Sequence, residues 1–258
     1  MHATHENREN LDVPRHARER GGPPHAATPH THRRWHIGVA LWLLGALALA
    51  VMAVFAHGHA QFPGDAGLTA LVRDANHTAL APALNFPSEA NNVPTGGVIY
   101  ITAILIFAAL KRIREAICVA FTTGIGGALN ALISAIVGRP RPAGAHVSTV
   151  GQLDTHSFPS GHVVSVVGLF GFLLFLTILI WRARPAQRPW LLPIQAVCVY
   201  FLALIGFGRV AEGAHQPSDV LAGYILGALL LALAIRLYHW LGRRWAMHQA
   251  KKAGARAA

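Results

Sequence analysis

The chain has 258 residues, of which 53% are hydrophobic and only 13% are charged, and its mean hydropathy is +0.40. Soluble domains carry about 25% charged residues, so this composition excludes an ordinary soluble domain and predicts a protein that crosses a membrane several times. A net charge of +11 would favour nucleic acid as a partner if the basic residues shared one folded face. They lie instead in short segments between apolar runs, so no nucleic-acid partner is expected.

The amino-terminal segment, residues 1–34, is polar and rich in His, Arg, Pro and Gly. It has too few apolar side chains to bury a core, which predicts a disordered cytoplasmic tail. Residues 35–56 then form an apolar run long enough to cross a hydrocarbon layer of about 30 Å. The next segment is mixed in polarity, and within it residues 68–80 are expected to form a short amphipathic helix at the membrane interface.

The rest of the chain alternates apolar runs with short polar turns. Five further spans are expected at 93–110, 116–137, 163–181, 190–207 and 218–238. Gly208 and Arg209 are expected to open a polar loop before the last span, and the basic segment 239–258 to form a second cytoplasmic tail. The predicted fold class is therefore all-α: a six-span transmembrane helical bundle over residues 35–238.

The basic residues predict which way the bundle faces. Six spans place both termini on one side of the membrane, and 18 of the 22 Lys and Arg residues lie in the amino-terminal tail, in the turns at 111–114 and 182–188, and in the carboxyl end from Arg236 onward. The positive-inside rule makes that side cytoplasmic. The other four are Arg73, Arg139, Arg141 and Arg209.

Three polar segments, 139–142, 157–162 and 208–219, are thus brought together at the extracytoplasmic ends of the third to sixth spans. Ionisable groups near a membrane are costly to place, so such clusters indicate a functional site. We therefore expect the extracytoplasmic loops to form the active site.

The residue types in these segments suit a phosphate group. Arg141 and Arg209 offer planar guanidinium groups that match phosphate oxygens. Ser160 and Gly161 precede a predicted helix, where free backbone N–H groups favour an anion. The three segments therefore predict a pocket for a phosphoryl group.

Two histidines and a carboxylate complete the pattern. His215 and Asp219 are four residues apart and would share one face if a helix begins there, so that the carboxylate can fix the tautomer of a nucleophilic imidazole. His162 supplies a second imidazole. Together with the arginines, these side chains predict a phosphoryl-transfer site that needs no metal and no cofactor.

Residues 138–142, 158–162 and 208–219 resemble the three signature motifs of the type 2 phosphatidic acid phosphatase family, the membrane lipid phosphatase branch. The resemblance implies that His215 attacks phosphorus to form a phosphohistidine, that Asp219 orients it, and that His162 protonates the leaving oxygen and then activates water. The phosphate-binding residues that it implies are Arg139, Arg141, Ser160, Gly161 and Arg209.

The sequence departs from the family pattern at two positions. The first motif of the family begins with a lysine where this chain has Ser134, and no Lys or Arg occurs anywhere in residues 115–138. The serine usual before the arginine of the third motif is Gly208 here. The phosphate pocket is therefore expected to lack one cation and one hydroxyl, and we interpret the chain as a divergent but active enzyme.

The expected substrate is a lipid phosphate or diphosphate, of the undecaprenyl diphosphate, phosphatidylglycerol phosphate, phosphatidic acid or lipid A type. Two alternatives stay open, namely a lipid phosphotransferase that uses the same intermediate and a non-catalytic lipid-binding membrane protein. The long, basic chain, rich in Ala and Arg, is typical of a bacterial protein, which predicts a location in the bacterial inner (cell) membrane.

Overall fold

The computed structural model describes residues 29–142 and 156–257, and these residues are helical with no β-strand among them. The chain divides into two compact units, Met1–Leu41 and Trp42–Ala258, and the architecture below is that of the second. The α-helices are α1 (Pro29–Gly58), α2 (Asp65–Asn76), α3 (Ala81–Ala90), α4 (Thr95–Ala109), α5 (Ile113–Ala120), α6 (Gly126–Val137), α7 (Gly161–Ala183), α8 (Arg188–Ala211) and α9 (Pro217–Ala257).

The all-α transmembrane fold is confirmed. Five continuous stretches are long and apolar enough to cross a membrane: His36–Gly58, Ile113–Val137, Gly161–Ala183, Pro185–Ala211 and Pro217–Ala253. The stretch Ile113–Val137 joins α5 to α6 through one π-helical turn, Phe121–Ile125. These stretches contain five of the six predicted spans.

The span expected at 93–110 has a different form. Its helix α4 has 15 residues, which at 1.5 Å per residue gives about 22 Å, short of a hydrocarbon layer of about 30 Å. With α3 it makes a pair bent by 64°, and the pair passes as a sixth span only if both helices are counted together. The break falls at Asn91–Pro94 and places polar side chains between the two helices.

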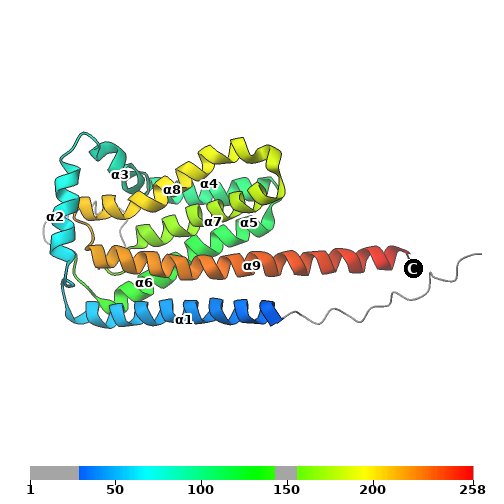
Figure 1. The fold of residues 1–258 in the computed structure, drawn as a ribbon, viewed down its shortest axis with the longest axis horizontal. Helices are drawn as coiled ribbons and strands as arrows, with labels where there is room; N and C mark the ends of the chain where they lie inside the picture. The colour runs from blue at the N-terminus through cyan, green and yellow to red at the C-terminus, as the bar shows by residue number, and fades with distance from the viewer. Residues whose placement is uncertain (1–28, 143–155, 258) are drawn as a thin grey trace, which may run out of the picture. The chain divides into compact units, whose positions relative to one another are not determined.

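Helix α7 lies at the centre of the fold, packed against both α8 and α9 (Figure 1). Glycines allow the close approach of α7 and α9, since a Cβ added at Gly227 would lie 2.7 Å from the Cβ of Val167. A Cβ at Gly223 would similarly lie 2.8 Å from the carbonyl oxygen of Ser160. The amino-terminal ends of the two helices are therefore held side by side.

Helix α2 packs against α8 and α9, and Figure 1 shows it lying across the end of the bundle at which α8 ends and α9 begins. It corresponds to the short helix expected at 68–80, although it begins and ends earlier, at Asp65 and Asn76. The three motif segments contact one another at this end, and residues of α2 line a cavity together with His215.

The helix ends differ from the predicted ones. Gly208 and Arg209 lie inside the last turn of α8 rather than in a loop, because that turn is buried and packs against α3. Helix α1 begins at Pro29, six residues before the predicted span, and the remainder of the predicted amino-terminal tail lies outside the described residues. Helix α9 continues through the basic carboxyl-terminal segment to Ala257, in a stretch rich in helix-forming Ala, Lys and Arg.

Candidate active site

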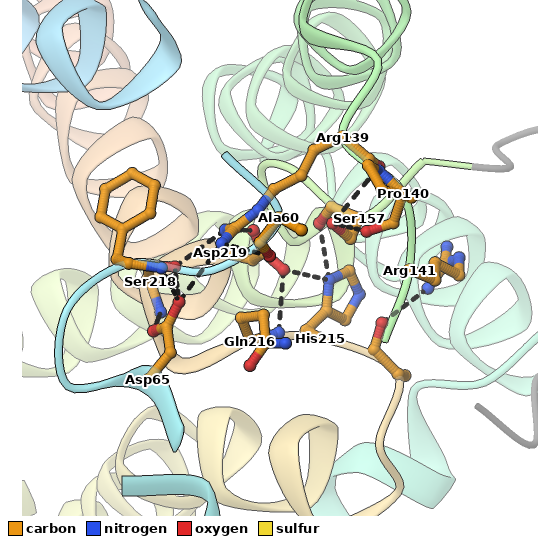
Figure 2. A network of polar contacts seen from close by, with 12 residues as sticks. Ala60, Asp65, Arg139, Pro140, Arg141, Ser157, His215, Gln216, Ser218 and Asp219 are labelled. Carbon is orange, nitrogen blue, oxygen red and sulfur yellow. Dashed lines mark hydrogen bonds and ion pairs between the residues drawn. The ribbon is translucent and has the colours of Figure 1, made fainter. Parts of the chain in front are cut away.

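The three motif-bearing segments meet at the starts of α7 and α9. The backbone N–H of Ser157 donates to the carbonyl oxygen of Arg139 at 2.9 Å, and an isolated β-bridge joins Pro140 to His156. The N–H of Ser160 donates to the carbonyl oxygen of Asp219 at 3.1 Å. Figure 2 shows the side chains that these backbone contacts bring together.

His215 is buried and has one ring nitrogen fixed by the backbone. Its Nδ1 lies 2.7 Å from the carbonyl oxygen of Ser157. A carbonyl oxygen only accepts hydrogen bonds, so Nδ1 carries the proton and Nε2 keeps a lone pair in the neutral ring. Nε2 makes no hydrogen bond to any of the described residues. The ring therefore has the tautomer required of a nucleophile.

Asp219 influences His215 through charge rather than through a direct hydrogen bond. Its Oδ2 is 3.9 Å from Nδ1 of His215, beyond hydrogen-bond distance. The same oxygen accepts the N–H of Gln216 at 2.8 Å, as the third residue of a helix does in a capping box. The two residues were expected to share one helical face if a helix began at His215, but α9 begins at Pro217, so His215 precedes the helix.

The surroundings of His215 keep its ring neutral. Burial lowers the pKa of His215 well below its usual range, and the nearby charges of Arg209, Arg141 and His162 lower that pKa further. The hydrogen bond to the carbonyl of Ser157 acts in the opposite direction but is the weaker influence. At neutral pH the imidazole of His215 is therefore available to attack.

Arg139 is buried in the protein interior and does not line the cavity beside His215. Its side chain is 0% exposed. Its Nη1 donates to Oδ1 of Asp219 at 2.5 Å, and its Nη2 donates to Oδ2 of Asp65 at 3.2 Å. The phosphate-binding role expected for Arg139 does not fit this geometry, because its guanidinium is already occupied by two carboxylates.

Arg209 and Arg141 approach the site from α8 and from the loop after α6. The Nη1 of Arg209 donates to Glu212 at 2.7 Å and to Oδ1 of Asn92 at 3.0 Å. The Nη1 of Arg141 donates to the carbonyl oxygen of Ala214 at 3.1 Å. Their charges act on the neighbouring His215, so two of the expected phosphate-binding cations are brought to it.

The remaining predicted residues lie at the start of α7. Nε2 of His162 is 3.1 Å from Oδ1 of Asn92, the same oxygen that accepts from Arg209. The hydroxyl of Ser160 is buried without a hydrogen-bond partner among the described residues. A Cβ at Gly161 would lie 2.9 Å from Nδ2 of Asn130, so only glycine fits there without displacing Asn130.

A cavity of about 540 Å³ opens beside His215. Arg73 and Asp74 in the carboxyl-terminal half of α2 line this cavity, as do His77, directly after α2, and Pro142 and Gln216. The described residues contain no group of three His, Cys, Asp or Glu side chains placed to hold a metal ion.

Comparison with known proteins decides the family. Over residues 115–243, half of the chain, the sequence matches the profile of the PAP2 superfamily. The chain belongs to the PAP2 superfamily. The sequence-based recognition of this family is therefore confirmed, and the three motif segments all lie within or beside the matched region.

Individual PAP2 relatives match over part of their length. Undecaprenyl-diphosphatase BcrC of Bacillus subtilis is 35% identical over 127 residues, which cover 47% of this chain and 55% of that protein. Lipid A 1-phosphatase of Rhizobium johnstonii is 33% identical over 118 residues, which cover 42% of this chain and 41% of that protein. The chain thus spans about half the length of these curated relatives.

A solved structure shares the fold. The transmembrane PAP2 type phosphatidylglycerolphosphate phosphatase from Bacillus subtilis superposes with a TM-score of 0.57 over 75% of this chain and 93% of that one. The identity is 19%, so this likeness concerns the fold alone. The chain is accordingly a multi-pass membrane protein of the PAP2 type.

The missing hydroxyl of the third PAP2 motif has a structural counterpart in α3. A Cβ at Gly208 would lie 2.5 Å from the Cβ of Ser88, so a serine at position 208 cannot fit beside it. Ser88 is fully buried, and its Oγ accepts a hydrogen bond from Nη1 of Arg209 at 3.4 Å. Ser88 therefore occupies the space of the absent side chain and supplies a hydroxyl next to the arginine.

Sequence reasoning missed four polar residues of the site: Asp65, Ser88, Asn92 and Ser157. Asp65 and Asn92 were detectable in principle as ionisable or amide groups beside apolar runs in a chain poor in charge. Ser88 gave no signal, because a lone serine before a bend is common in loops. The role of Ser157 lies in its backbone carbonyl, which no side-chain pattern reveals.

Because Ser88 fills the space beside Gly208, we expect substitutions at these two positions to compensate for each other. Gly208→Ser alone should lower the free energy of unfolding by about 1–3 kcal/mol, because the new side chain overlaps Ser88. Adding Ser88→Gly should recover most of that loss, since the hydroxyl then returns to position 208. Thermal unfolding in detergent micelles measures both.

Gly127→Ala is the matched control, because a Cβ there would meet nothing within 4 Å. A Gly208→Ser variant as stable as the wild type, or a double variant less stable than the single one, would contradict the exchange.

Proposed function

We propose that this protein is a membrane phosphatase that hydrolyses a lipid phosphate through a phosphohistidine, without a metal ion or cofactor. The observation that carries the proposal is the tautomer of His215, whose Nδ1 is held by the Ser157 carbonyl at 2.7 Å while Nε2 keeps its lone pair. A neutral, oriented imidazole beside a cavity and two arginines suits nucleophilic attack on phosphorus. Membership of the PAP2 superfamily supports the reaction class.

In the proposed first step, Nε2 of His215 attacks phosphorus and the bond from phosphorus to the lipid oxygen breaks. His162 donates a proton to that leaving oxygen, so the lipid departs as an alcohol or, from a diphosphate, as a monophosphate. In the second step, His162 takes a proton from water, whose oxygen attacks the phosphohistidine. Inorganic phosphate leaves, and neutral His215 is restored.

The surrounding groups supply electrostatic stabilisation. Arg141 and Arg209 would bind the phosphoryl oxygens, which carry the charge of the transition state. The first N–H groups of α7, after Ser160, would face the same anion. Asp219 would stabilise the positive charge that the imidazole of His215 gains on phosphorylation. The arginines and the N–H groups would thus stabilise the negative phosphoryl oxygens, and Asp219 would stabilise the positive imidazole.

A diphosphate is the substrate type that the cavity favours. Arg73 lines the cavity that also contains His215, and its exposed side chain has no ion pair or hydrogen bond to the described residues. In a diphosphate, the second phosphoryl group would place its negative charge near the guanidinium of Arg73, which can bind it. The relative BcrC is named an undecaprenyl-diphosphatase, which agrees with this preference.

For the location, we propose the bacterial inner membrane, with both termini in the cytoplasm and the site on the extracytoplasmic side. Eighteen of the 22 Lys and Arg residues lie on the side assigned to the cytoplasm. We also propose that residues 35–238 form the phosphatase domain and that residues 1–34 and 239–258 form cytoplasmic tails.

The phosphohistidine predicts chelator-resistant hydrolysis that depends on His215. Purified protein should release inorganic phosphate from a panel of lipid phosphates and diphosphates in the presence of EDTA. His215→Ala should reduce the rate at least about 10³-fold, because no other group provides the nucleophile. His248→Ala, which removes an exposed histidine near the carboxyl-terminal end of α9, serves as the matched control and should keep the nucleophilic step intact.

Transfer of the phosphoryl group to an added alcohol without release of phosphate would indicate the phosphotransferase instead. Absence of both reactions in folded protein that binds lipid phosphate would indicate a non-catalytic binding protein.

The lowered pKa of His215 predicts the acidic side of the pH profile. His215 attacks only when neutral, so kcat/KM should fall as the pH drops through its pKa. Because burial places that pKa well below the ordinary value of 6.5, the fall should occur below pH 6.5.

The pKa of the substrate phosphate is measured separately, and the pH profile is corrected for the ionisation of the substrate. A corrected profile that is flat, or whose acidic limb lies above pH 6.5, would contradict the role assigned to His215.

The diphosphate preference predicts an unequal effect of Arg73→Ala. This substitution should raise KM about tenfold for a prenyl diphosphate while changing KM for the matching monophosphate much less, since only the diphosphate reaches Arg73. Asp74→Asn changes the charge of the neighbouring cavity residue and should not raise KM for the diphosphate. Equal effects of Arg73→Ala on both substrates would show that Arg73 does not discriminate between them.

A further inference from the structure

Asp65, in the first turn of α2, is a buried carboxylate whose oxygens are all occupied. Its side chain is 3% exposed. Oδ1 accepts the backbone N–H of Ser218 at 2.9 Å, and Oδ2 accepts the hydroxyl of Ser218 at 2.7 Å and the N–H of Phe62 at 2.8 Å. Oδ2 also receives Nη2 of Arg139 at 3.2 Å. Asp65 thus joins the segment before α2 to the start of α9.

Arg139 lies between two carboxylates. Its two terminal nitrogens point to different acids, Nη1 to Asp219 at 2.5 Å and Nη2 to Asp65 at 3.2 Å (Figure 2). The guanidinium is fully buried, and its centre is 4.9 Å from the centre of the Phe62 ring. Water cannot screen these charges strongly, so their sum determines the field that the neighbouring groups experience.

The sum of these three charges is negative. Arg139 contributes one positive charge, and Asp65 and Asp219 contribute one negative charge each. If Arg139 were paired with Asp219 alone, the pair would be neutral. Because Asp65 shares the guanidinium, one net negative charge remains in the cluster, and Asp219 is its member nearest to His215, at 3.9 Å.

We propose that Asp65 is a positioning residue of the phosphatase site, which shares Arg139 so that Asp219 keeps its negative charge available to His215. The inference rests on the proposed function, because it concerns the positive charge that His215 gains on becoming phosphohistidine. Asp65 does not touch the substrate or His215. It acts through Arg139 and through the start of α9, which its bonds to Ser218 hold in place.

The other charges around His215 explain why this negative charge is needed. The groups that face the ring besides Asp219 are cationic or can become so: Arg141, His162 and Arg209. They suit an incoming phosphate but disfavour a positive imidazole. A neutral Arg139–Asp219 pair would leave that repulsion unopposed, whereas the cluster of Asp65, Arg139 and Asp219 offsets it.

A series of charge variants tests the proposal in the full-length protein. Asp65→Asn makes the cluster neutral, Arg139→Gln gives it two negative charges, and the double variant returns it to one. Each is purified in detergent, checked for folding by thermal unfolding, and assayed for kcat, KM and the pH dependence of kcat/KM on a lipid phosphate that the wild type hydrolyses.

The expected results follow the charge of the cluster. Asp65→Asn should lower kcat about tenfold or more with little change in KM, and should move the acidic limb about one pH unit lower, because a protonated His215 becomes less stable. Arg139→Gln should move that limb higher. The double variant should have an acidic limb close to that of the wild type, although it lacks every bond between Asp65 and Arg139.

Glu89→Gln is the matched control, since it removes one carboxylate charge from an exposed position on α3. It should leave the acidic limb unchanged. If Asp65→Asn does not fold, the opposite shift in Arg139→Gln and its cancellation in the double variant still decide the question.

If Asp65 had a purely structural role, the three variants would be impaired in a different order. The double variant would then be the most impaired, and the acidic limb would not follow the charge; either result would overturn the inference. Absence of hydrolysis by the wild type would instead refute the proposed function, so the two failures are distinguishable.

Discussion

The site depends on burying the positive charge of Arg139. A buried guanidinium is stable only when its charge is paired and its N–H groups are hydrogen-bonded. Here the partners come from the segment before α2, from the first turn of α2 and from the start of α9. That single requirement ties residues 60–65 to residues 139 and 218–219, and it places α2 over the end of the bundle.

The same end of the bundle combines polar chemistry with a membrane fold. The described helices are mostly apolar, yet their ends carry Asn92, Arg209 and His162 in contact with one another. Asn92 lies in the short segment between α3 and α4, at the bend of 64°. The broken span therefore contributes a residue to the site.

The pocket also shows how a PAP2 motif can change without losing a group. Gly208 removes a side chain from α8, and the buried Ser88 of α3 enters the space and places its hydroxyl by Arg209. The lysine absent at Ser134 has no such replacement in Arg139, which is held by carboxylates. Of the cations near the cavity, Arg73 on α2 is one that the family motifs do not include.

The sequence by itself determined the membrane fold and the residues at the centre of the site. Hydropathy over some 20 residues is a local property, and the residues within each motif are close together in the chain, so both could be read directly. Tertiary structure alone decided the break at α3–α4, the helical position of Arg209, the carbonyl partner of His215 and the sharing of Arg139 between Asp65 and Asp219. These features arise from contacts between residues far apart in the chain, such as Asp65 with Ser218 and Ser88 with Arg209. Local patterns do not encode such contacts, because the burial that makes a charge seek a partner exists only once the helices have packed.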